Sequence, residues 1–179
     1  MRAMHRPRLA LSVLAALLLA VGGALLATSG SSAAPSKSQS LFKKTLLADA
    51  ETTSAVKNLL RSGGIVAPDI AFADLTGDGR SDAVVLVDTG GVAGGVALYV
   101  FSTDGEAQES DLRAVYRSQR LYRASAEIVD ARLVVRAPRF TEGDDVCCPA
   151  KVVQRTYAWN DRDRALRLRS SEEMKGPTG

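Results

Sequence analysis

The chain has 179 residues, a length that suits one ordinary domain behind a short leader. Its formal net charge of +3 is accounted for by Arg2, Arg6 and Arg8, so acids and bases balance from Ala34 onward and the high pI does not indicate nucleic-acid binding. The single histidine is His5, so the rest of the chain lacks the side chain needed for a Ser-His-Asp or Cys-His mechanism or a histidine-containing zinc site.

The first 33 residues have the pattern of a secretory signal peptide. A short basic segment, residues 1–8, precedes an uncharged Leu/Ala-rich run, residues 9–27, and then small polar residues. We expect cleavage after Ala33, which predicts a protein that is secreted or held in the cell envelope, without stable membrane insertion. The alternative is an uncleaved anchor, because the apolar run approaches the length that spans a bilayer. No cysteine follows this run, so no lipobox for a lipid anchor is expected.

Residues 34–61 divide into a linker and a helical segment. Residues 34–40 are polar and read as a linker. Residues 41–61 space Leu and Val as in an amphipathic helix, or two helices, ending at the stop signal of residues 62–64. The cluster at residues 52–54, Thr-Thr-Ser, is a weak point at which the helix could break.

From residue 65 onward the pattern changes to short strands joined by turns. The apolar run at 83–87 is expected to be a central strand covered on both faces. A helix followed by consecutive strands predicts an α+β fold, with an N-terminal helix and an antiparallel meander sheet, as one domain over residues 41–170 before a disordered tail at 171–179. The expected strands are 70–73, 83–87, 96–101, 112–118, 126–129, 132–135, 151–159 and 165–169.

The loop before the central strand carries oxygen-bearing side chains at alternate positions. Gly77 and Gly79 permit the positive φ values that a tight curl requires. A hard cation such as Ca²⁺ takes about six to eight oxygen ligands, so the pattern predicts a calcium site. The alternative is a tight Asp/Gly turn that caps a strand without metal. The side chains concerned are Asp74, Thr76, Asp78 and Asp82.

This loop is not an EF-hand, because the twelfth position counted from Asp74 is Val85 instead of Glu, and a strand follows. Over residues 72–86, its strand-flanked spacing Asp-x-Thr-Gly-Asp-Gly-x-x-Asp resembles the calcium loop of FG-GAP and VCBS-type repeats. Thr76 stands where that family usually has Asp or Asn, which lowers the charge of the ligand set. The loop occurs once, so a propeller of several blades is not expected. The resemblance implies side-chain ligands from Asp74, Thr76, Asp78 and Asp82, and a backbone carbonyl from Arg80.

Two adjacent cysteines, Cys147 and Cys148, lie in a chain bound for an oxidising compartment. We expect a vicinal disulfide that stiffens the loop around them; reduced thiols or a bond between two chains are the alternatives. A redox role would favour Cys-x-x-Cys spacing, and metal ligation would need two further soft ligands that the chain does not contain.

Residues 143–150, which include Cys-Cys-Pro, are followed by a strand carrying Tyr157-Ala158-Trp159-Asn160. This arrangement resembles the C-terminal part of LppP/LprE-like envelope proteins of actinobacteria, and the Ala/Arg-rich composition agrees with such a source. The resemblance covers about the last third of the chain and implies a location more than an activity. The absent lipobox departs from the lipoproteins of that family.

Three further stretches carry weaker signals. The glycine-rich residues 89–95 lack the helix and the lysine of a phosphate-binding loop. The carboxylates of Glu142, Asp144 and Asp145 share a loop, whereas a glycosidase needs two carboxylates across a cleft. An arginine series could attract an anionic polymer, although a solvated strand face is the simpler interpretation. The series is Arg113, Arg117, Arg120 and Arg123.

These observations predict a secreted cell-envelope protein that acts as a non-enzymatic binding or structural module with one Ca²⁺ site. The alternatives are an extracellular hydrolase that uses carboxylates only and an inhibitor or partner-binding protein. The sequence names no partner; an envelope component or another protein is the expectation, and nucleic acid is not.

Overall fold

A computed structural model of the chain describes residues 34–103, 112–145 and 147–176. The predicted signal peptide or anchor, residues 1–33, lies outside this described part. Within the described part, two short helices precede nine strands. The helices are α1 (Lys37–Ala48) and α2 (Ser54–Arg61). The strands are β1 (Ile65–Val66), β2 (Ala71–Ala73), β3 (Asp82–Asp88), β4 (Gly95–Thr103), β5 (Leu112–Ser118), β6 (Ser125–Val129), β7 (Arg132–Arg139), β8 (Lys151–Asn160) and β9 (Ala165–Lys175).

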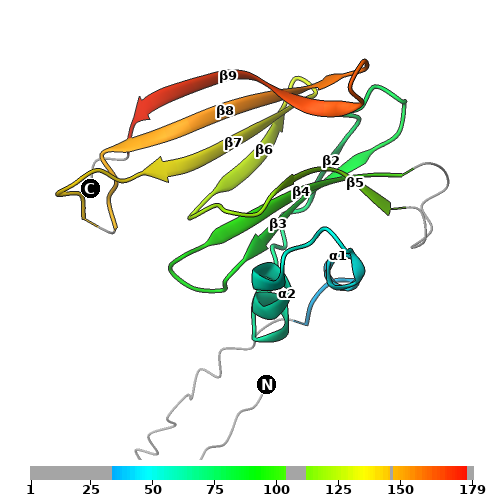
Figure 1. Cartoon of the computed structure of the whole chain (residues 1–179), viewed down its shortest axis with the longest axis horizontal. Helices are drawn as coiled ribbons and strands as arrows, with labels where there is room; N and C mark the ends of the chain where they lie inside the picture. The colour runs from blue at the N-terminus through cyan, green and yellow to red at the C-terminus, as the bar shows by residue number, and fades with distance from the viewer. Residues whose placement is uncertain (1–33, 104–111, 146, 177–179) are drawn as a thin grey trace, which may run out of the picture. The chain divides into compact units, whose positions relative to one another are not determined.

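The strands form two antiparallel sheets (Figure 1). The first has the order β1-β3-β4-β5, and β2 also pairs with β3. β1 and β2 share one edge of β3, because β1 pairs with residues 87–88 and β2 with residues 82–84 of that strand. The second sheet has the order β6-β7-β8-β9. β3 therefore has neighbours on both edges, and the prediction of a central strand at 83–87 is confirmed.

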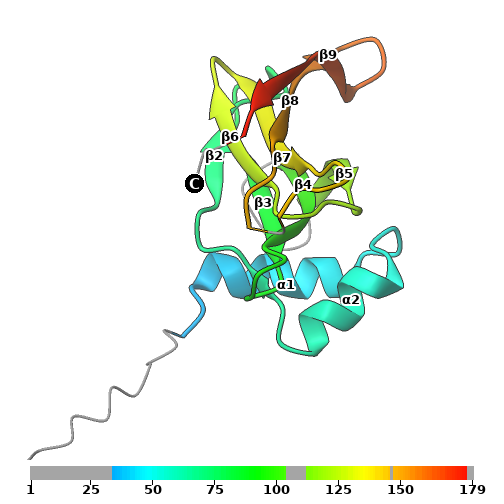
Figure 2. The ribbon, with the colours of Figure 1, turned by 90° about the vertical axis from the view of Figure 1, so that its left-hand side faces the viewer.

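Alternate side chains of β3 enter two different hydrophobic cores. Ala83, Val85 and Val87 pack with the buried side chains of both helices. Val84 and the partly buried Leu86 pack on the other side with buried residues of β7 and β9. The helices thus cover one face of the first sheet and the second sheet covers the other (Figure 2). Burial on both faces explains the uninterrupted apolar sequence of this strand.

The predicted α+β class is wrong. Strand is the dominant regular structure of the described residues, in two antiparallel sheets, and helix is limited to 12 residues in α1 and 8 in α2. The expected single meander is also wrong, because β5 pairs with β4 and β6 pairs with β7, but β5 and β6 lie in different sheets.

The division between the sheets arises at residues 119–124, which cross the end of the first sheet instead of reversing beside β5. The side-chain oxygen of Gln119 accepts a hydrogen bond of 2.7 Å from the Thr53 backbone N–H. At the other end of the segment, the Ala124 N–H donates to the Gly95 carbonyl over 3.0 Å. The first bond ties the segment to the turn between the helices and the second ties it to the start of β4, before β6 begins a new sheet.

The N-terminal segment forms two helices that are separated at the predicted cluster, with α2 starting at Ser54. α1 begins at Lys37, inside the segment expected to be a linker. The cause is a capping box: the Gln39 N–H donates to the Ser36 hydroxyl over 3.1 Å, and the Ser36 N–H donates to the Gln39 side-chain oxygen over 2.8 Å.

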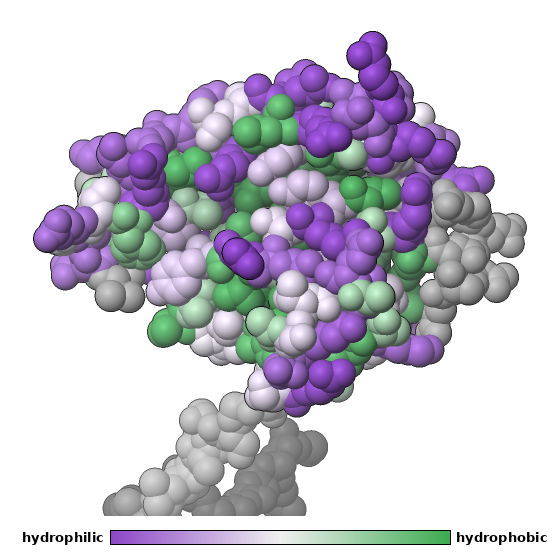
Figure 3. Space-filling view, in the orientation of Figure 1, coloured by the Kyte–Doolittle hydropathy of each residue, from purple (hydrophilic) through white to green (hydrophobic). Residues whose placement is uncertain are grey.

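β9 extends further than predicted. A strand ending at residue 169 and a disordered tail from 171 were expected, but residues 171–175 pair with β8. Gly176 continues the contact by donating its N–H to the Ala150 carbonyl over 2.8 Å. The upper edge of the molecule in Figure 3, formed by β9 and the β8–β9 turn, is largely hydrophilic. Charged side chains on an edge strand discourage pairing with a second chain, which explains why this strand looks like a tail in the sequence.

Candidate cation loop and neighbouring cavities

The predicted calcium loop lies between β2 and β3, and its last residue, Asp82, is the first residue of β3. Leu75, the second residue of the loop, is buried with residues of both sheets. Asp82 is 0% exposed. The loop is therefore held at both ends, by an apolar side chain in the core and by a buried carboxylate.

The Asp82 carboxylate uses one oxygen for the loop backbone. Its Oδ2 accepts hydrogen bonds from the N–H groups of Leu75, at 2.8 Å, and Thr76, at 2.9 Å. Its other oxygen, Oδ1, is buried without a hydrogen-bond partner, and so is the Thr76 hydroxyl oxygen. Buried polar atoms are nearly always partnered in folded proteins, so two orphaned oxygens in one short loop require an explanation.

The remaining loop residues form turns. The Asp74 carboxylate accepts hydrogen bonds from the N–H groups of Gly77, at 2.6 Å, and Gly79, at 2.9 Å. Asp78 Oδ1 accepts one from the Arg80 N–H at 2.8 Å. The φ angles of 76° at Gly77 and 83° at Gly79 confirm the positive values expected there.

The structure brings all five predicted ligand residues into one loop, but it does not gather their carboxylates around a point. Across the described residues, no group of three or more His, Cys, Asp or Glu side chains is placed to hold a metal ion. The donor chemistry still suits a hard cation: the loop offers three carboxylates, one of them with an orphaned oxygen, the orphaned Thr76 hydroxyl and an exposed backbone turn. The calcium site stays a prediction.

A small cavity of about 290 Å³, which we call the loop–turn cavity, adjoins this loop. Its lining comes from the loop, from β4 and β5 of the first sheet, and from β8 and the turn before β9. Sequence reasoning missed it, because the turn residues were interpreted only as a strand connection. Its lining residues are Thr76, Gly77, Asp78, Ser102, Arg113, Trp159, Asp161 and Arg164.

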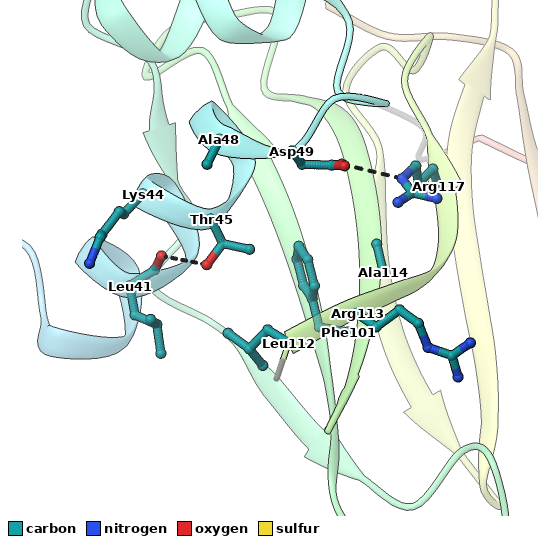
Figure 4. Close-up of a pocket in the computed structure, with 10 residues that line it drawn as sticks. All are labelled: Leu41, Lys44, Thr45, Ala48, Asp49, Phe101, Leu112, Arg113, Ala114 and Arg117. Atoms are coloured by element: carbon teal, nitrogen blue, oxygen red, sulfur yellow. Dashed lines mark hydrogen bonds and ion pairs between the residues drawn. The ribbon is translucent and has the colours of Figure 1, made fainter. Parts of the chain in front are cut away.

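A larger groove of about 640 Å³ runs between α1 and β5 (Figure 4). Leu41 of the helix faces Leu112 of the strand, and the ring of Phe101 lies beyond Leu112, near Ala114. An ion pair between Asp49 and Arg117, 3.4 Å apart, closes one end. The groove combines apolar side chains with charged ones, and Asp49 is the only carboxylate among its ten lining residues, beside the cations of Lys44, Arg113 and Arg117.

The Asp49 carboxylate joins the turn between the helices to β5. It accepts hydrogen bonds from the Glu51 N–H, at 3.2 Å, and the Thr52 hydroxyl, at 2.9 Å. Arg117 pairs with both Asp49 and Glu51. Burial opposes ionisation of Asp49, but the hydrogen bonds from Glu51 and Thr52, together with the Arg117 charge, outweigh it and lower the pKa of Asp49 below its ordinary value.

A lowered pKa in the folded state predicts a specific acid sensitivity. The stabilisation by Asp49 is present above its unfolded-state pKa, near 4, and is lost as the pH falls through the lower folded-state pKa. We expect wild type to exceed Asp49→Asn in free energy of unfolding at pH 6, and this difference to shrink as the pH falls below about 4. Urea unfolding of both proteins across this range measures it; a difference that does not change with pH would refute the assignment.

The structure bonds Cys147 to Cys148. Arg123 donates a hydrogen bond from Nη1 to the Cys147 carbonyl over 3.3 Å, while Arg117 is paired with acids, so two members of the arginine series have internal partners. Asp144 is also engaged: hydrogen bonds from the N–H groups of Thr141 and Ala150 lower its pKa. A general acid requires a raised pKa, so Asp144 does not suit that role.

The chain is similar to a lipoprotein. That lipoprotein is CseA of Streptomyces avermitilis, which is 32% identical to this chain over 111 residues; these make up 62% of this chain and 49% of CseA. The chain thus spans about half the length of the curated relative it matches. No family model matches the chain, so that comparison supports neither the FG-GAP nor the LppP/LprE resemblance. No solved structure matches it either.

None of the helices in the described ranges has the length and apolar character required to cross a bilayer. The segment interpreted as a signal peptide or anchor, residues 1–33, is not among those ranges.

Proposed function

We propose that the protein is a cell-envelope binding or structural module whose loop at residues 74–82 takes one Ca²⁺ ion. The leader-like N-terminus supports export, and the similarity to a protein named as a lipoprotein supports a location in the envelope. The orphaned oxygens of Thr76 and Asp82 are the observation that carries the calcium proposal.

The role of the ion follows from the position of the loop. Asp82 Oδ2 already holds the loop backbone, so Oδ1 and the Thr76 hydroxyl are the oxygens left for a ligand. Asp74, Asp78 and the Arg80 carbonyl would complete an oxygen set. The ion would neutralise clustered carboxylates and fix the first residue of β3, so its binding free energy would add to the stability of the fold.

Calcium is expected to raise the melting temperature of the domain. Extracellular calcium sites have dissociation constants of about 0.1–1 mM, so 10 mM Ca²⁺ would add roughly 1.4–2.7 kcal/mol. For a domain of this size that corresponds to a rise of about 5 °C relative to EDTA. Differential scanning fluorimetry of residues 34–179 measures the shift.

Two variants make this test specific. Asp78→Ala removes a proposed ligand from an exposed position and should abolish the rise. Asp88→Ala is the matched control, because Asp88 makes a similar turn contact, to the Gly90 N–H at 2.6 Å, at the opposite end of β3. It should leave the calcium response unchanged. Equal melting of the wild type in Ca²⁺ and EDTA would reject the calcium site.

The hydrolase alternative loses support at its nominated loop, because Asp144 is committed to backbone hydrogen bonds. The loop–turn cavity does contain two carboxylates, of Asp78 and Asp161. The hydrolase alternative therefore applies to that cavity, where a cleavage assay tests it.

A further inference from the structure

The loop–turn cavity combines an aromatic surface with opposite charges. Trp159 is half-buried and lines the cavity from β8. Asp161 and Arg164 are exposed on the adjoining turn and also line the cavity. Neither of these two side chains has an ion-pair or hydrogen-bond partner among the residues that the structure describes. They are therefore available to a ligand that reaches both.

The charges that line the cavity cancel. Its carboxylates are Asp78 and Asp161, and its guanidinium groups are Arg113 and Arg164. A carboxylate only accepts hydrogen bonds and a guanidinium only donates them. A neutral ligand must therefore present donors and acceptors side by side, and a hydroxyl group supplies both.

The indole ring of Trp159 requires a second property, a face of C–H groups that can pack on an aromatic ring. Sugar rings have hydroxyl groups around their edge and such an apolar face. The volume of about 290 Å³ lies at the lower end of small-molecule sites, which suits one ring. A phosphate or another anion would be attracted by Arg113 and Arg164 but repelled by Asp78 and Asp161, so the lining gives it no net attraction.

The turn that carries both charged groups is fixed in place. The N–H groups of Arg162 and Asp163 donate hydrogen bonds to the Asn160 side-chain oxygen, at 3.0 and 3.3 Å. Arg164 has a positive φ of 48° in this turn. The backbone that presents Asp161 and Arg164 to the cavity is therefore held in a defined conformation.

We propose that the loop–turn cavity binds one neutral sugar ring, with Trp159 packed on the ring face and Asp161 and Arg164 bound to its hydroxyl groups. This ligand class deepens the proposed function as a binding module. The sugar site rests on the proposed function in one respect: bound calcium would hold the loop side of the cavity in place. A free monosaccharide and the terminal residue of a glycan share this chemistry.

The chain contains one tryptophan, so its fluorescence reports directly on this cavity. We expect N-acetylglucosamine and chitotetraose, added to residues 34–179 in millimolar Ca²⁺, to change the emission of Trp159 in a saturable way. The dissociation constants should be on the order of 1 mM. Similar values for the two sugars indicate one bound ring, and tighter binding of the tetramer indicates a glycan chain. Calorimetry provides the second readout.

Substitutions within the β8–β9 turn distinguish residues that line the cavity from a neighbouring residue that does not. Asp161→Asn and Arg164→Asn should weaken binding about tenfold, because each removes a charged hydrogen-bonding group. Asparagine is chosen at Arg164 because it tolerates a positive φ. Arg162→Ala is the matched control: Arg162 is exposed in the same turn but does not line the cavity, and its binding should equal that of wild type.

The absence of both a fluorescence change and a heat of binding with either sugar would overturn the inference, as would equal weakening by Arg162→Ala. Cleavage of chitotetraose by wild type, detected by mass spectrometry, would replace the binding role by hydrolysis. Titration in EDTA distinguishes this inference from the calcium proposal. Sugar binding without a calcium effect on melting refutes only the metal site, and a calcium effect without sugar binding refutes only the sugar site.

Discussion

Asp82→Ala is expected to lower the free energy of unfolding by about 3 kcal/mol in EDTA, where no ion contributes. The substitution removes the acceptor for two N–H groups, those of Leu75 and Thr76, which lie 2.8 and 2.9 Å from Oδ2. Both donors belong to buried residues, so water does not readily replace the lost bonds. Relief of a buried charge offsets part of the loss. Urea unfolding with a linear fit measures the difference.

Asp78→Ala is the control for this experiment. Asp78 is exposed and accepts one hydrogen bond, from the Arg80 N–H. Its replacement should cost less than about 1 kcal/mol in EDTA while abolishing the calcium response. A loss at Asp82 no larger than the loss at Asp78 would show that the buried carboxylate does not organise the loop.

Gly95→Ala is expected to destabilise the protein by about 3 kcal/mol, because an added Cβ overpacks a site that cannot easily relax. Gly95 lies where the first sheet meets the segment that leads to the second, and it forms a β-bridge with Ala124. A Cβ at this position would collide with the Ala124 carbonyl oxygen and approach Leu86 Cδ2 to 2.6 Å. For this chain length the melting temperature should fall by about 10 °C.

Gly91→Ala, in the same β3–β4 turn, is the matched control. Gly91 is exposed, and the nearest atom to an added Cβ is the Thr89 hydroxyl oxygen at 4.0 Å. The stability should change by less than about 0.5 kcal/mol. Equal effects of the two substitutions would show that the loss does not come from the close contacts of Gly95 with Ala124 and Leu86.

Local features of the fold were predictable from the sequence because they depend on neighbouring residues. The strand at residues 112–118 has the predicted bounds, and the hairpin at Asp130-Ala131 turns through positive φ values of 48° and 54°. The helix break falls at threonines, which continue a helix poorly, although Thr53 at the N-cap of α2 makes no side-chain capping hydrogen bond. Each of these signals acts within a few residues of the structure that it specifies.

The two-sheet arrangement was not predictable in this way. Strand alternation shows which side chains share a face but not which strands are neighbours. The contacts that place the segment between β5 and β6 join residues far apart in the chain, such as Gln119 with Thr53. No local sequence pattern predicts such contacts. The tail was misjudged for a related reason: an edge strand with charges on both faces has the composition of a disordered segment.

The candidate site was predictable in part. The spacing of the Asp and Gly residues identified the loop and its positive φ values. It did not reveal that Asp82 is buried or that one of its oxygens is left without a partner. The cavity beside the loop draws Trp159 from a strand about 80 positions later, and the only sequence signal was an aromatic residue next to a charged turn.

The neighbour relations within the sheets bear on how the chain reaches this structure. In the second sheet every strand pairs with the next in sequence, and β3, β4 and β5 do the same in the first. Closing such consecutive hairpins costs little chain entropy. Contacts between the sheets, such as those in the core shared by Leu75 and Leu166, join residues that are distant in the chain. Docking of two preformed sheets, more than formation of either one, should therefore set the folding rate.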